Sequence, residues 1–545
     1  MTGGFTAPQI DWAALAPILI VLGAGVIGVL VEAFVPRGPR RTVQLALALV
    51  ATAGAVVALA ALWDGVTQDG GTVVLGGSVI LDGPSLLLQG LVAVLTLLSL
   101  LVVADRTATG EDAFAPSAAA VPGSDYEQLA RRQGVVQTEV YPLILFAAGG
   151  MMIFTAAGDL LTMFVALEVL SLPLYLLSGM ARRRRLLSQE AAMKYFLLGA
   201  FSSALFLFGV ALLYGFAGSV RLDAIAEATA TVVGLDPLLL AGAVMVLVGL
   251  LFKVGAVPFH SWTPDVYQGA PTPITGFMAA CTKVAAFGAL LRVVYVVVPS
   301  IHWDLRPVLW AIVLLTMAVG TVVALVQTDM KRILAYSAVA HTGFILTGVV
   351  ALEKSGIGSV IFYLTAYGAA TVGAFAIVTL VREKAADGVV LGEATHLSQW
   401  AGLGRRNPWL AVAFSLFLLS FAGIPLTAGF IGKFAVFSSA IEGDATPLAV
   451  AGVVASAVAV FFYVRIIVLM FFTDAPRSGE PAGTPAGPAA VTGAGDTGAA
   501  GVTVVRSEGL TTVTIVVTAA LTVLLGVFPA PVLDVLTGEV TRFVP

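Results

Sequence analysis

The sequence is short of charge and carries a single cysteine, and both shortages exclude whole classes of protein. Of its 545 residues, 11% are charged and 59% are apolar, with a mean hydropathy of +1.00. That composition leaves too little polar surface for a soluble globule, so the chain is a polytopic membrane protein. Cys281 alone cannot form an internal disulfide, and no CxxC pair offers a cysteine site for a metal or an iron–sulfur cluster.

Signals for redox centres and nucleotides are missing as well. A haem held by two histidines needs both at membrane depth, and of the four histidines only His341 lies there. No glycine-rich nucleotide loop follows a predicted strand. The net charge of −4 is small and the basic residues form no patch, which excludes a nucleic-acid partner. We expect no cofactor in this chain, so the energy for any transport comes from elsewhere.

Long apolar runs fill most of the chain. A membrane-spanning helix needs about 20 apolar residues to cross roughly 30 Å of hydrocarbon. By that measure the sequence predicts an all-α polytopic membrane protein with 14 transmembrane helices. The first has no basic segment before it and is expected to be retained, not cleaved as a signal. The approximate bounds of the spans are 13–35, 42–63, 84–104, 139–157, 159–180, 190–216, 238–260, 273–298, 307–327, 331–351, 357–381, 409–440, 447–473 and 510–529.

The charges between the spans test this count, because cytoplasmic loops of membrane proteins accumulate Lys and Arg. The odd-numbered loops hold 18 of these residues, with the densest cluster at Arg182 to Arg185. The even-numbered loops hold only 3, which are Arg221, Arg306 and Lys354. This asymmetry predicts that the odd loops face the cytoplasm and that both termini lie on the outer side. The weakest division is at Gly158 and Asp159, which alone separate the fourth span from the fifth.

Two spans carry helix-breaking sequences at matching places. The seventh contains Gly255-Ala256-Val257-Pro258 and the twelfth contains Gly423-Ile424-Pro425, and proline removes a helix donor and clashes with the preceding turn. Spans four to eight and nine to thirteen form two groups of five, and the broken helix is the fourth member of each. Because five is odd, the second group starts from the opposite side of the membrane. The order therefore predicts two inverted five-helix repeats, as in transporter cores.

The whole chain divides accordingly. Residues 1–138 form an N-terminal three-helix segment that ends in a polar cytoplasmic loop at 105–138. The two repeats occupy 139–298 and 307–473. Residues 474–509 are so rich in Gly, Ala and Pro that we expect a flexible linker, and 510–545 hold the last span and a tail. We assign no chemistry to the loop or to the linker.

Four ionisable residues lie deep inside the spans. They are Glu168, Lys253, Lys283 and Lys433. An ionised side chain at membrane depth costs about 2.5–3.5 kcal/mol even on the most lenient insertion scale, so several in one chain indicate a polar interior path. Each broken helix also places unsatisfied backbone groups near a lysine, Lys253 or Lys433. The bland alternatives are a structural carboxylate for Glu168 and a lysine that reaches the head groups for Lys253.

Other polar residues have ordinary explanations beside functional ones. His341 lies at the middle of the tenth span, where a reference pKa of about 6.5 suits a proton carrier, but a hydrogen-bonded core histidine explains it equally well. Lys194 follows Glu190 by four residues, so an i,i+4 pair near the interface explains it as well as a role in the path does. Arg292 and Arg465 lie close to span ends and are expected to reach the head groups.

The charges in this set depend on one another. Desolvation opposes the charged forms of lysine and glutamate, whereas pairing the two favours both charges. Neighbouring lysines cannot all remain charged, so their titrations are coupled. A proton that arrives at one lysine displaces a proton from the next, which is the physical minimum for moving protons through a membrane interior.

A long motif at the first helix break resembles a known family. It reads FKVGAVPFHSWTPDVYQGAPTPITGFMAACTK over residues 252–283 and is similar to the antiporter-like membrane subunits of the proton-pumping NADH:quinone oxidoreductase, respiratory complex I. Its Asp-Val-Tyr-Gln-Gly wording is typical of one branch of that family, whereas sister branches read closer to Leu-Pro-Asp-Ala-His. The resemblance covers spans four to thirteen. Supporting segments are DLLTMFVALEVLSLPLYLLSG, EAAMKYFLLGAFSSALFLFG, QTDMKRILAYSAVAHTGFIL and GIPLTAGFIGKF.

The resemblance implies a fold of 14 helices with two inverted five-helix repeats, which matches the count above. By motif position, Glu168 and Lys253 are similar to the Glu–Lys pair of the family. Lys283 matches its connecting lysine and Lys433 its terminal lysine beside the second broken helix. His341 matches a residue of the central polar axis.

The resemblance also implies a setting for the chain. Lys194 matches a lysine of one branch, with a less defined duty. NAD, FMN, iron–sulfur clusters and quinone are implied to be bound by partner subunits of complex I in a bacterial plasma membrane. Quinone reduction elsewhere in the complex would change charge along the axis, and this chain would take a proton from the cytoplasm and release it outside.

Two other functions remain compatible with the residues. A subunit of a secondary cation/proton antiporter would share the folded core, and sodium-dependent transport by a complex without quinone chemistry would identify it. A membrane scaffold that does not pump would tolerate Lys253→Ala or Glu168→Gln with full proton translocation.

Overall fold

The helices begin and end close to the predicted spans. The computed structural model describes residues 10–68, 70–107, 112–116, 124–133, 135–385, 390–474 and 499–544. In this part of the chain twelve helical segments are long and apolar enough to cross a membrane. They are α1 (Trp12–Phe34), α2 (Arg37–Gln68), α3 (Gly83–Ala104), α6 (Leu160–Ser178), α7 (Arg185–Ala217), α9 (Asp236–Val254), the joined α11, η2 and α12 (Thr272–Phe277, Met278–Thr282, Lys283–Val296), the joined η3 and α13 (Val298–Ile301, His302–Val326), α14 (Met330–Val350), α15 (Lys354–Leu380), α19 (Thr446–Phe472) and α20 (Leu510–Val527).

Two shorter apolar helices lie within the predicted fourth and twelfth stretches. They are α5 (Val140–Ala156) and α17 (Pro408–Ala422). The narrow division after α5 is present, because Asp159 accepts a hydrogen bond from the Thr162 amide and so starts α6 with a capped first turn. A Cβ on Gly158 would lie 2.2 Å from the carbonyl oxygen of Gly77, in the turn of the 72–81 hairpin, so only glycine fits this close approach between the hairpin and the junction of the two helices.

Both predicted helix breaks are present and have the same local structure. α9 is followed by Gly255 at φ +78°, and the short helix α10 (Trp262–Gly269) comes after it. α17 is followed by Gly423 at φ +79° and then by α18 (Ala428–Glu442). Left-handed backbone costs other residues about 1–2 kcal/mol, which explains glycine at each break. In both, the next amide bonds back to a carbonyl five residues earlier, as in a Schellman cap: Ala256 to Leu251, and Ile424 to Leu419.

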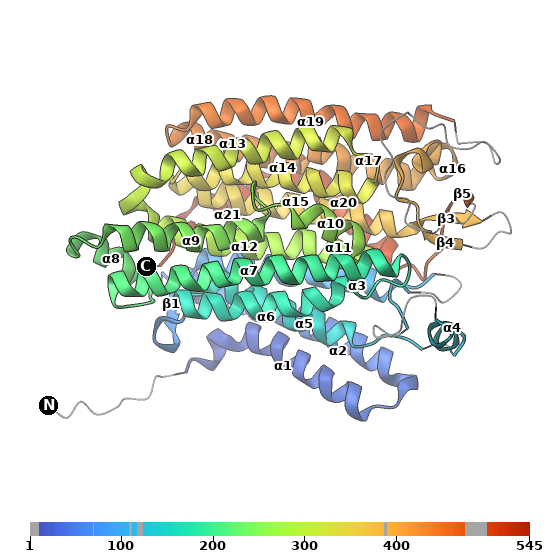
Figure 1. The fold of residues 1–545 in the computed structure, drawn as a ribbon, viewed down its shortest axis with the longest axis horizontal. Coiled ribbons are helices and arrows are strands. Elements are labelled where there is room, and N and C mark those ends of the chain that lie inside the picture. Colours follow the sequence, from blue (N-terminus) through green and yellow to red (C-terminus); the bar gives the residue numbers. More distant parts are fainter. Residues whose placement is uncertain are drawn as a thin grey trace.

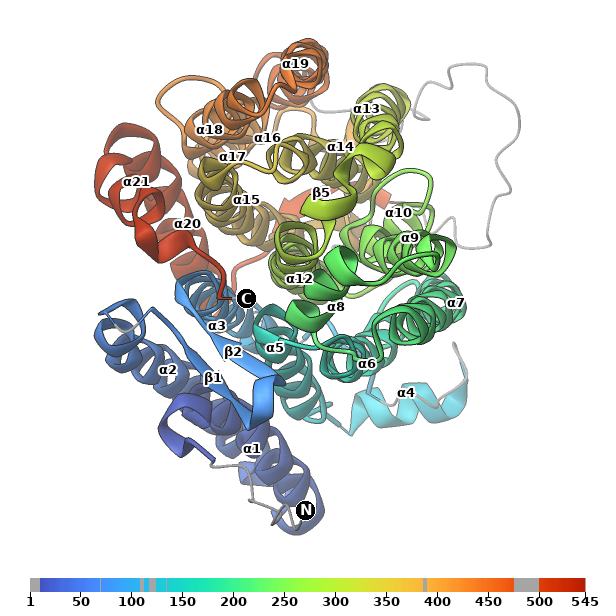
Figure 2. The same ribbon diagram turned by 90° about the vertical axis from the view of Figure 1, so that its left-hand side faces the viewer.

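Three helical segments near the centre of the bundle are buried on nearly all sides. The most apolar stretches of the joined α11–α12 segment, α14 and α15 are 100%, 89% and 94% buried. Figure 2 shows α12 near the centre, with α14 and α15 beside it. The corresponding stretches of α2 and α19 are each 28% buried and expose apolar side chains such as Val57 and Phe461. The bundle thus has a protein-enclosed centre and an apolar periphery suited to lipid or neighbouring subunits.

The two ends of the bundle carry different elements (Figure 1). At one end lie α4 (Asp125–Arg132), α16 (Leu403–Arg406) and an antiparallel sheet in the order β4–β3–β5, formed by Val390–Glu393, Val381–Ala385 and Ala499–Val504. The arginine cluster 182–185 lies at this end, where Arg182 and Arg184 bond to Asp112 and Glu383. We call it the basic end. The opposite end, the far end, holds the antiparallel hairpin of β1 (Thr72–Val74) and β2 (Val79–Leu81), α8 (Leu222–Thr231) and α21 (Ala530–Thr537).

Two stretches that were expected to lack structure contain some. The polar loop 105–138 includes α4. Most of the expected linker, residues 475–498, lies outside the described residues, but its final part forms β5 and pairs with β3 from Val381↔Val504 to Ala385↔Ala499. The strand therefore ties the segment before α20 to the end of α15. α1 begins at the far end, where the C-terminal segment also ends (Figure 1).

Candidate functional site

Lys253 lies in the last turn of α9 and points into the bundle. Lys253 is only 4% exposed. The ammonium Nζ donates to Ser171 Oγ over 2.7 Å and to Tyr195 Oη over 3.4 Å. The Tyr195 ring stacks on Trp262 at 4.7 Å between centroids and lies 5.3 Å from Nζ, a distance at which cation–π attraction operates. Lys253 is thus held by α6 and α7 and does not reach the head groups.

Glu168 lies one turn before Ser171 on the same side of α6. Its Oε1 atom is buried and has no hydrogen-bond partner in the described part of the chain. Glu168 and Lys253 form no ion pair within 4.0 Å among these residues. The expected Glu–Lys pair is therefore separated, and Ser171 is the group that Lys253 contacts on the helix of Glu168.

Lys283 follows a single π-helical turn, η2, a feature often found at functional sites. Its Nζ donates to the Ala338 carbonyl and to Thr342 Oγ1, each over 2.6 Å. Thr342 in turn donates to the Val254 carbonyl over 2.8 Å. That carbonyl belongs to the last residue of α9, where the helix break removes its partner. One hydroxyl of α14 therefore joins Lys283 to the first broken helix, directly beside Lys253.

His341 lies in the middle of α14 and is 2% exposed. Nδ1 is hydrogen-bonded to Tyr363 Oη at 2.7 Å, and Nε2 to Tyr463 Oη at 3.2 Å. Tyr463 is also hydrogen-bonded to Ser337. Both ring nitrogens thus have a hydroxyl partner, and these come from α15 and α19. A hydroxyl can donate to one nitrogen and accept from the other, so either neutral tautomer of the ring is satisfied.

Lys433 lies on α18 and reaches back to the end of α17. Nζ donates to the carbonyls of Phe421 and Ala422 over 2.9 and 3.0 Å, and to Ser456 Oγ over 2.7 Å. These carbonyls end a helix, where the backbone dipole favours positive charge. A Cβ on Gly423 would lie 2.8 Å from Lys433 Cδ, so glycine serves both the left-handed turn and the space for the lysine. The second break therefore holds its lysine directly through backbone oxygens.

The buried groups follow one another across the bundle. Lys253 and Lys283 are linked through the Val254 carbonyl and Thr342. The Tyr367 ring lies 5.4 Å from Lys283 Nζ and 4.9 Å from the His341 ring. The Phe344 ring lies 5.7 Å from His341 and 4.8 Å from Lys433 Nζ. His341 thus lies between Lys283 and Lys433, with one aromatic ring on each side. We call this series, from Glu168 to Lys433, the polar row.

Lys194 lies apart from the polar row at the surface near the basic end. Its side chain is 42% exposed and bonds to Glu190 Oε1 at 2.7 Å and to Asp265 Oδ2 at 2.8 Å. Asp265, on α10, also accepts from Arg332 Nη1 at 2.8 Å. The expected i,i+4 pair is present, and a second acid from the first broken helix extends it. Among the residues predicted from sequence, Lys194 is the one that the structure does not bring into the row.

Several residues of the polar row carried no distinct sequence signal. Hydroxyl groups of serine, threonine and tyrosine are common in apolar helices, so nothing in the sequence separates those that touch a lysine from the rest. A position one turn from Glu168 could have directed attention to Ser171, and a position next to His341 to Thr342. The other partners come from distant helices: Tyr195, Tyr363, Tyr463 and Ser456.

A charged cluster lies at the basic end, above the start of α11. Glu393 of β4 accepts from Thr272 Oγ1 over 3.3 Å and lies 3.9 Å from Arg382 Nη2. Burial alone would raise the pKa of Glu393, but the charges of Arg382 and the buried Lys331 hold it below its ordinary value. Lys331 is 4% exposed and donates to the Ala270 carbonyl over 2.7 Å. The β3–β4 hairpin thus places an ionised carboxylate at the start of α11.

Arg292 does not reach the head groups, and that expectation is wrong. Its side chain is 0% exposed, and Nη2 donates to both carboxylate oxygens of Asp82 over 2.9 and 3.0 Å. The Phe543 ring lies 4.7 Å from the guanidinium carbon, and the Val544 amide donates to Asp82 Oδ2 over 3.1 Å. The C-terminal segment therefore closes over a buried ion pair between α3 and α12. Asp82, the N-cap of α3, lies too far away in sequence to be paired with Arg292 by pattern.

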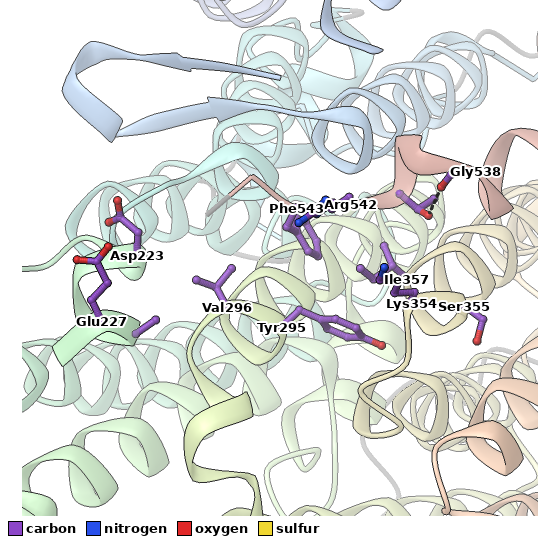
Figure 3. A pocket seen from close by; sticks show the side chains of 12 residues that line it. Asp223, Glu227, Tyr295, Val296, Lys354, Ser355, Ile357, Gly538, Arg542 and Phe543 are labelled. Carbon is purple, nitrogen blue, oxygen red and sulfur yellow. Dashed lines mark hydrogen bonds between the residues drawn. The ribbon is translucent and has the colours of Figure 1, made fainter. Parts of the chain in front are cut away.

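A cavity of about 770 Å³ opens at the far end, away from the polar row (Figure 3). Asp223 and Glu227 of α8 lie on one side of it, Lys354 and Ser355 of α15 on the other, and Tyr295 between them. None of the buried lysines lines it. Within the described residues no group of three His, Cys, Asp or Glu side chains could hold a metal ion.

The chain is similar to proteins of one family. The family profile described as "NADH:quinone oxidoreductase/Mrp antiporter, TM" matches residues 157–459. A relative from Beutenbergia cavernae, NADH-quinone oxidoreductase subunit N, is 63% identical over 99% of this chain and 99% of its own. These matches cover both broken helices and the whole polar row.

Solved structures are similar as well. A chain of respiratory complex I from Thermus thermophilus with bound aureothin superposes with a TM-score of 0.72, at 31% identity, over 96% of this chain and 100% of its own. A chain of the Mrp complex from Dietzia sp. DQ12-45-1b gives a TM-score of 0.73 at 23% identity, over 96% and 97%. The second likeness concerns the fold alone.

Proposed function

Since the chain belongs to the NADH:quinone oxidoreductase/Mrp antiporter family, we propose that it is a proton-translocating membrane subunit of an NADH:quinone oxidoreductase. It does no redox chemistry itself, because quinone reduction takes place in other subunits. The Asp-Val-Tyr-Gln-Gly wording of the motif agrees with the subunit N relatives. The alternative of a secondary cation/proton antiporter subunit is not favoured, since the likeness to the Mrp complex is one of fold.

The polar row carries the proposal. Its members are Glu168, Lys253, Lys283, His341 and Lys433. Hydroxyl and carbonyl groups lie between the first three members, and the Tyr367 and Phe344 rings lie on either side of His341. Two lysines in a protein interior repel each other, so a proton that arrives near Lys253 lowers the stability of the charge on Lys283. The proton then passes from Lys283 to His341, and from His341 to Lys433 at the second break. Lys194 and its carboxylate partners lie near the basic end, at the edge of this path.

The 14-span fold with two inverted five-helix repeats is part of the proposal. The twelve candidate spans together with α5 and α17 support the number, and the identical caps at Gly255 and Gly423 support the relation between the halves. The domain boundaries at 139–298 and 307–473 follow from it. Each half contributes one broken helix, and the last carbonyl before each break lies beside a lysine of the polar row.

The orientation follows from charge. The basic end would face the cytoplasm and the far end the outer side of a bacterial plasma membrane, with both termini outside, because positive loops are retained inside. The partners are the other membrane and peripheral subunits of complex I, which carry NAD, FMN, iron–sulfur clusters and quinone. Moving one charge against 100 mV costs about 2.3 kcal/mol, which their chemistry must provide.

The first experiment is isolation of the complex that contains this chain. Flavin and iron–sulfur subunits that co-purify, together with quinone-dependent proton uptake in vesicles, support the proposal. Lys433→Ala is expected to lower the number of protons moved per NADH oxidised, while Lys354→Ala, an exposed lysine at the far end, is the control. Sodium-dependent transport in a complex without quinone chemistry would identify an antiporter instead, and full pumping by Lys253→Ala and Glu168→Gln would identify a scaffold.

A further inference from the structure

A second cavity at the far end has a different character from the first. It measures about 430 Å³ and lies between the start of α13, the α14–α15 connection and the α18–α19 connection. We call it the α13 groove. The side chains that give it chemistry are His302, Trp303, Arg306, Trp310, Glu353 and Asp444. None of them belongs to the polar row, so the groove needs an explanation of its own.

Arg306 is held in place within the groove and keeps donors to spare. Its guanidinium carbon lies 6.0 Å from the Trp303 ring and 4.8 Å from the Trp310 ring. Nη2 donates to the Asp444 carbonyl over 2.9 Å. In the described part of the chain, no carboxylate lies within 4.0 Å of this guanidinium. A planar cation fixed by two indoles, with unused N–H groups, is a preorganised partner for the oxygens of a phosphate group.

The groove lies at the level of lipid head groups. α13 has 25 residues and is therefore about 37 Å long, which exceeds the hydrocarbon thickness of roughly 30 Å and leaves its first turns in the interface. Trp303 is 73% exposed there, as expected of an interfacial anchor. Beyond it α13 exposes Val308, Leu315 and Val322 at 50%, 50% and 59%. These side chains point away from Arg306 on the helix, and Trp303 lies between the two faces, so the acyl chains of a lipid in the groove would pass Trp303 to reach the apolar side of α13.

The charges of the groove select the head group. Glu353 and Asp444 also line it, and neither carboxylate forms an ion pair among the described residues. With one guanidinium and two carboxylates, the groove carries a net charge of about −1 and disfavours a lipid whose head group is purely anionic. We propose that the α13 groove binds a zwitterionic phospholipid with a primary amine, of the phosphatidylethanolamine class. Its phosphate is held by Arg306, and its ammonium lies toward Glu353 and Asp444.

Bound in this way, the lipid joins three separate segments. Arg306 belongs to α13, Glu353 to the connection before α15 and Asp444 to the connection after α18. Each would contact the same head group, so the lipid would staple the outer ends of these helices together. The inference depends on the membrane location of the chain and not on its role in pumping.

Photoreactive lipid tests the proposal on the assembled complex. Vesicles of matched composition, carrying either photoreactive phosphatidylethanolamine or photoreactive phosphatidylglycerol, are illuminated and the labelled peptides mapped. We expect the ethanolamine lipid to label residues 302–310 at least fivefold more than the glycerol lipid does. Equal labelling by the two lipids, or cross-links from a neighbouring subunit in place of lipid, would overturn the proposal.

Variants separate a bound lipid from general contact with the bilayer. Arg306→Ala is expected to reduce the ethanolamine label at least fivefold, and Arg306→Lys, which keeps the charge but not the planar stack, to reduce it less. Arg465→Ala is the control, because that exposed arginine also donates to a backbone carbonyl, of Leu325 at 3.2 Å, but lies outside the groove. Label retained in Arg306→Ala, measured per amount of assembled complex, would contradict the site.

The carboxylates provide an independent arm. The double variant Glu353→Gln with Asp444→Asn keeps the shape of the groove and removes its negative charge. We expect the preference for phosphatidylethanolamine over phosphatidylglycerol to fall from at least fivefold to about one. A preference that survives both substitutions would show that the carboxylates do not read the amine.

Discussion

Lys283 is joined to the Val254 carbonyl by one hydroxyl group, that of Thr342, which accepts from the lysine over 2.6 Å and donates to the carbonyl over 2.8 Å. The contact brings together α12, α14 and the end of the first broken helix. It also gives the orphan carbonyl at the break a donor, and it lies between Lys253 and Lys283, two lysines of the proposed proton path.

Thr342→Val is expected to interrupt the row at this point. Valine keeps the shape of threonine but cannot accept from Lys283, and a lost hydrogen bond to a charged group costs about 1.5–3 kcal/mol. We expect protons moved per NADH oxidised to fall several-fold in vesicles while NADH oxidation by uncoupled complex stays near wild type. Thr347→Val is the matched control, since Thr347 is equally buried on α14 and its hydroxyl donates to the Gly343 carbonyl of its own helix. Equal losses in the two variants would argue against the link.

Ser171→Ala tests the contact between Lys253 and the helix of Glu168. The ammonium would keep only the Tyr195 hydroxyl at 3.4 Å, a long hydrogen bond, so its charged form is less stabilised. We expect a several-fold lower pumping ratio with normal assembly, measured as above. Ser178→Ala provides the comparison, because Ser178 is also buried on α6 and its hydroxyl bonds to the Leu174 carbonyl. If Ser171→Ala pumps like Ser178→Ala, Ser171 has no part in the path.

Gly423→Ala is expected to damage the second break. Alanine at φ +79° costs about 1–2 kcal/mol, and its Cβ would lie 2.8 Å from Lys433 Cδ and so displace the lysine. Both thermal stability of the purified complex and pumping should fall. Gly215→Ala on α7 is the control, since a Cβ there meets its first neighbour at 3.9 Å. A stable, fully pumping Gly423→Ala complex would show that the position of Lys433 is not critical.

Arg292→Met is expected to destabilise the far end. It leaves the Asp82 carboxylate buried and without its cation, which costs about 3–5 kcal/mol, whereas replacing both partners by apolar residues is often close to neutral. Arg292→Met should therefore lower the thermal midpoint of the complex strongly. Arg292→Met with Asp82→Asn, which removes the unpaired charge but keeps an oxygen to cap α3, should recover most of the loss. Additive effects of the two substitutions would mean that the ion pair is not the source.

Much of the fold could be predicted from sequence because each membrane helix corresponds to a long apolar run of residues. The breaks were predictable at Gly255 and Gly423, since the glycine and proline chemistry is local. The burial of Lys253, Lys283 and Lys433 also followed from their places in the runs. The partners of the lysines could not be predicted, because they depend on how distant helices pack.

Residues that act across long sequence distances mark the limit. Asp82 caps α3, and Arg292 was expected to reach the head groups from its place near a span end. Only tertiary packing brings the two together. Glu168 and Lys253 were matched as a pair by motif position, whereas the contact of Lys253 with Ser171, one turn further along the same helix, depends on how α6 packs against α9. β5 was hidden for a related reason, since a short strand in a Gly- and Ala-rich stretch acquires its structure from pairing with β3.

All three lysines of the row are held by neutral oxygens. Lys253 bonds to two hydroxyls, Lys283 to a carbonyl and a hydroxyl, and Lys433 to two carbonyls and a hydroxyl; none has a carboxylate within 4.0 Å in the described part of the chain. When such an amine loses its proton, no unpaired anion remains beside it to attract the proton again. The same cradle also holds the neutral amine, because each hydroxyl can turn and donate to the freed lone pair. Discharge and recharge therefore require little rearrangement of the surrounding helices.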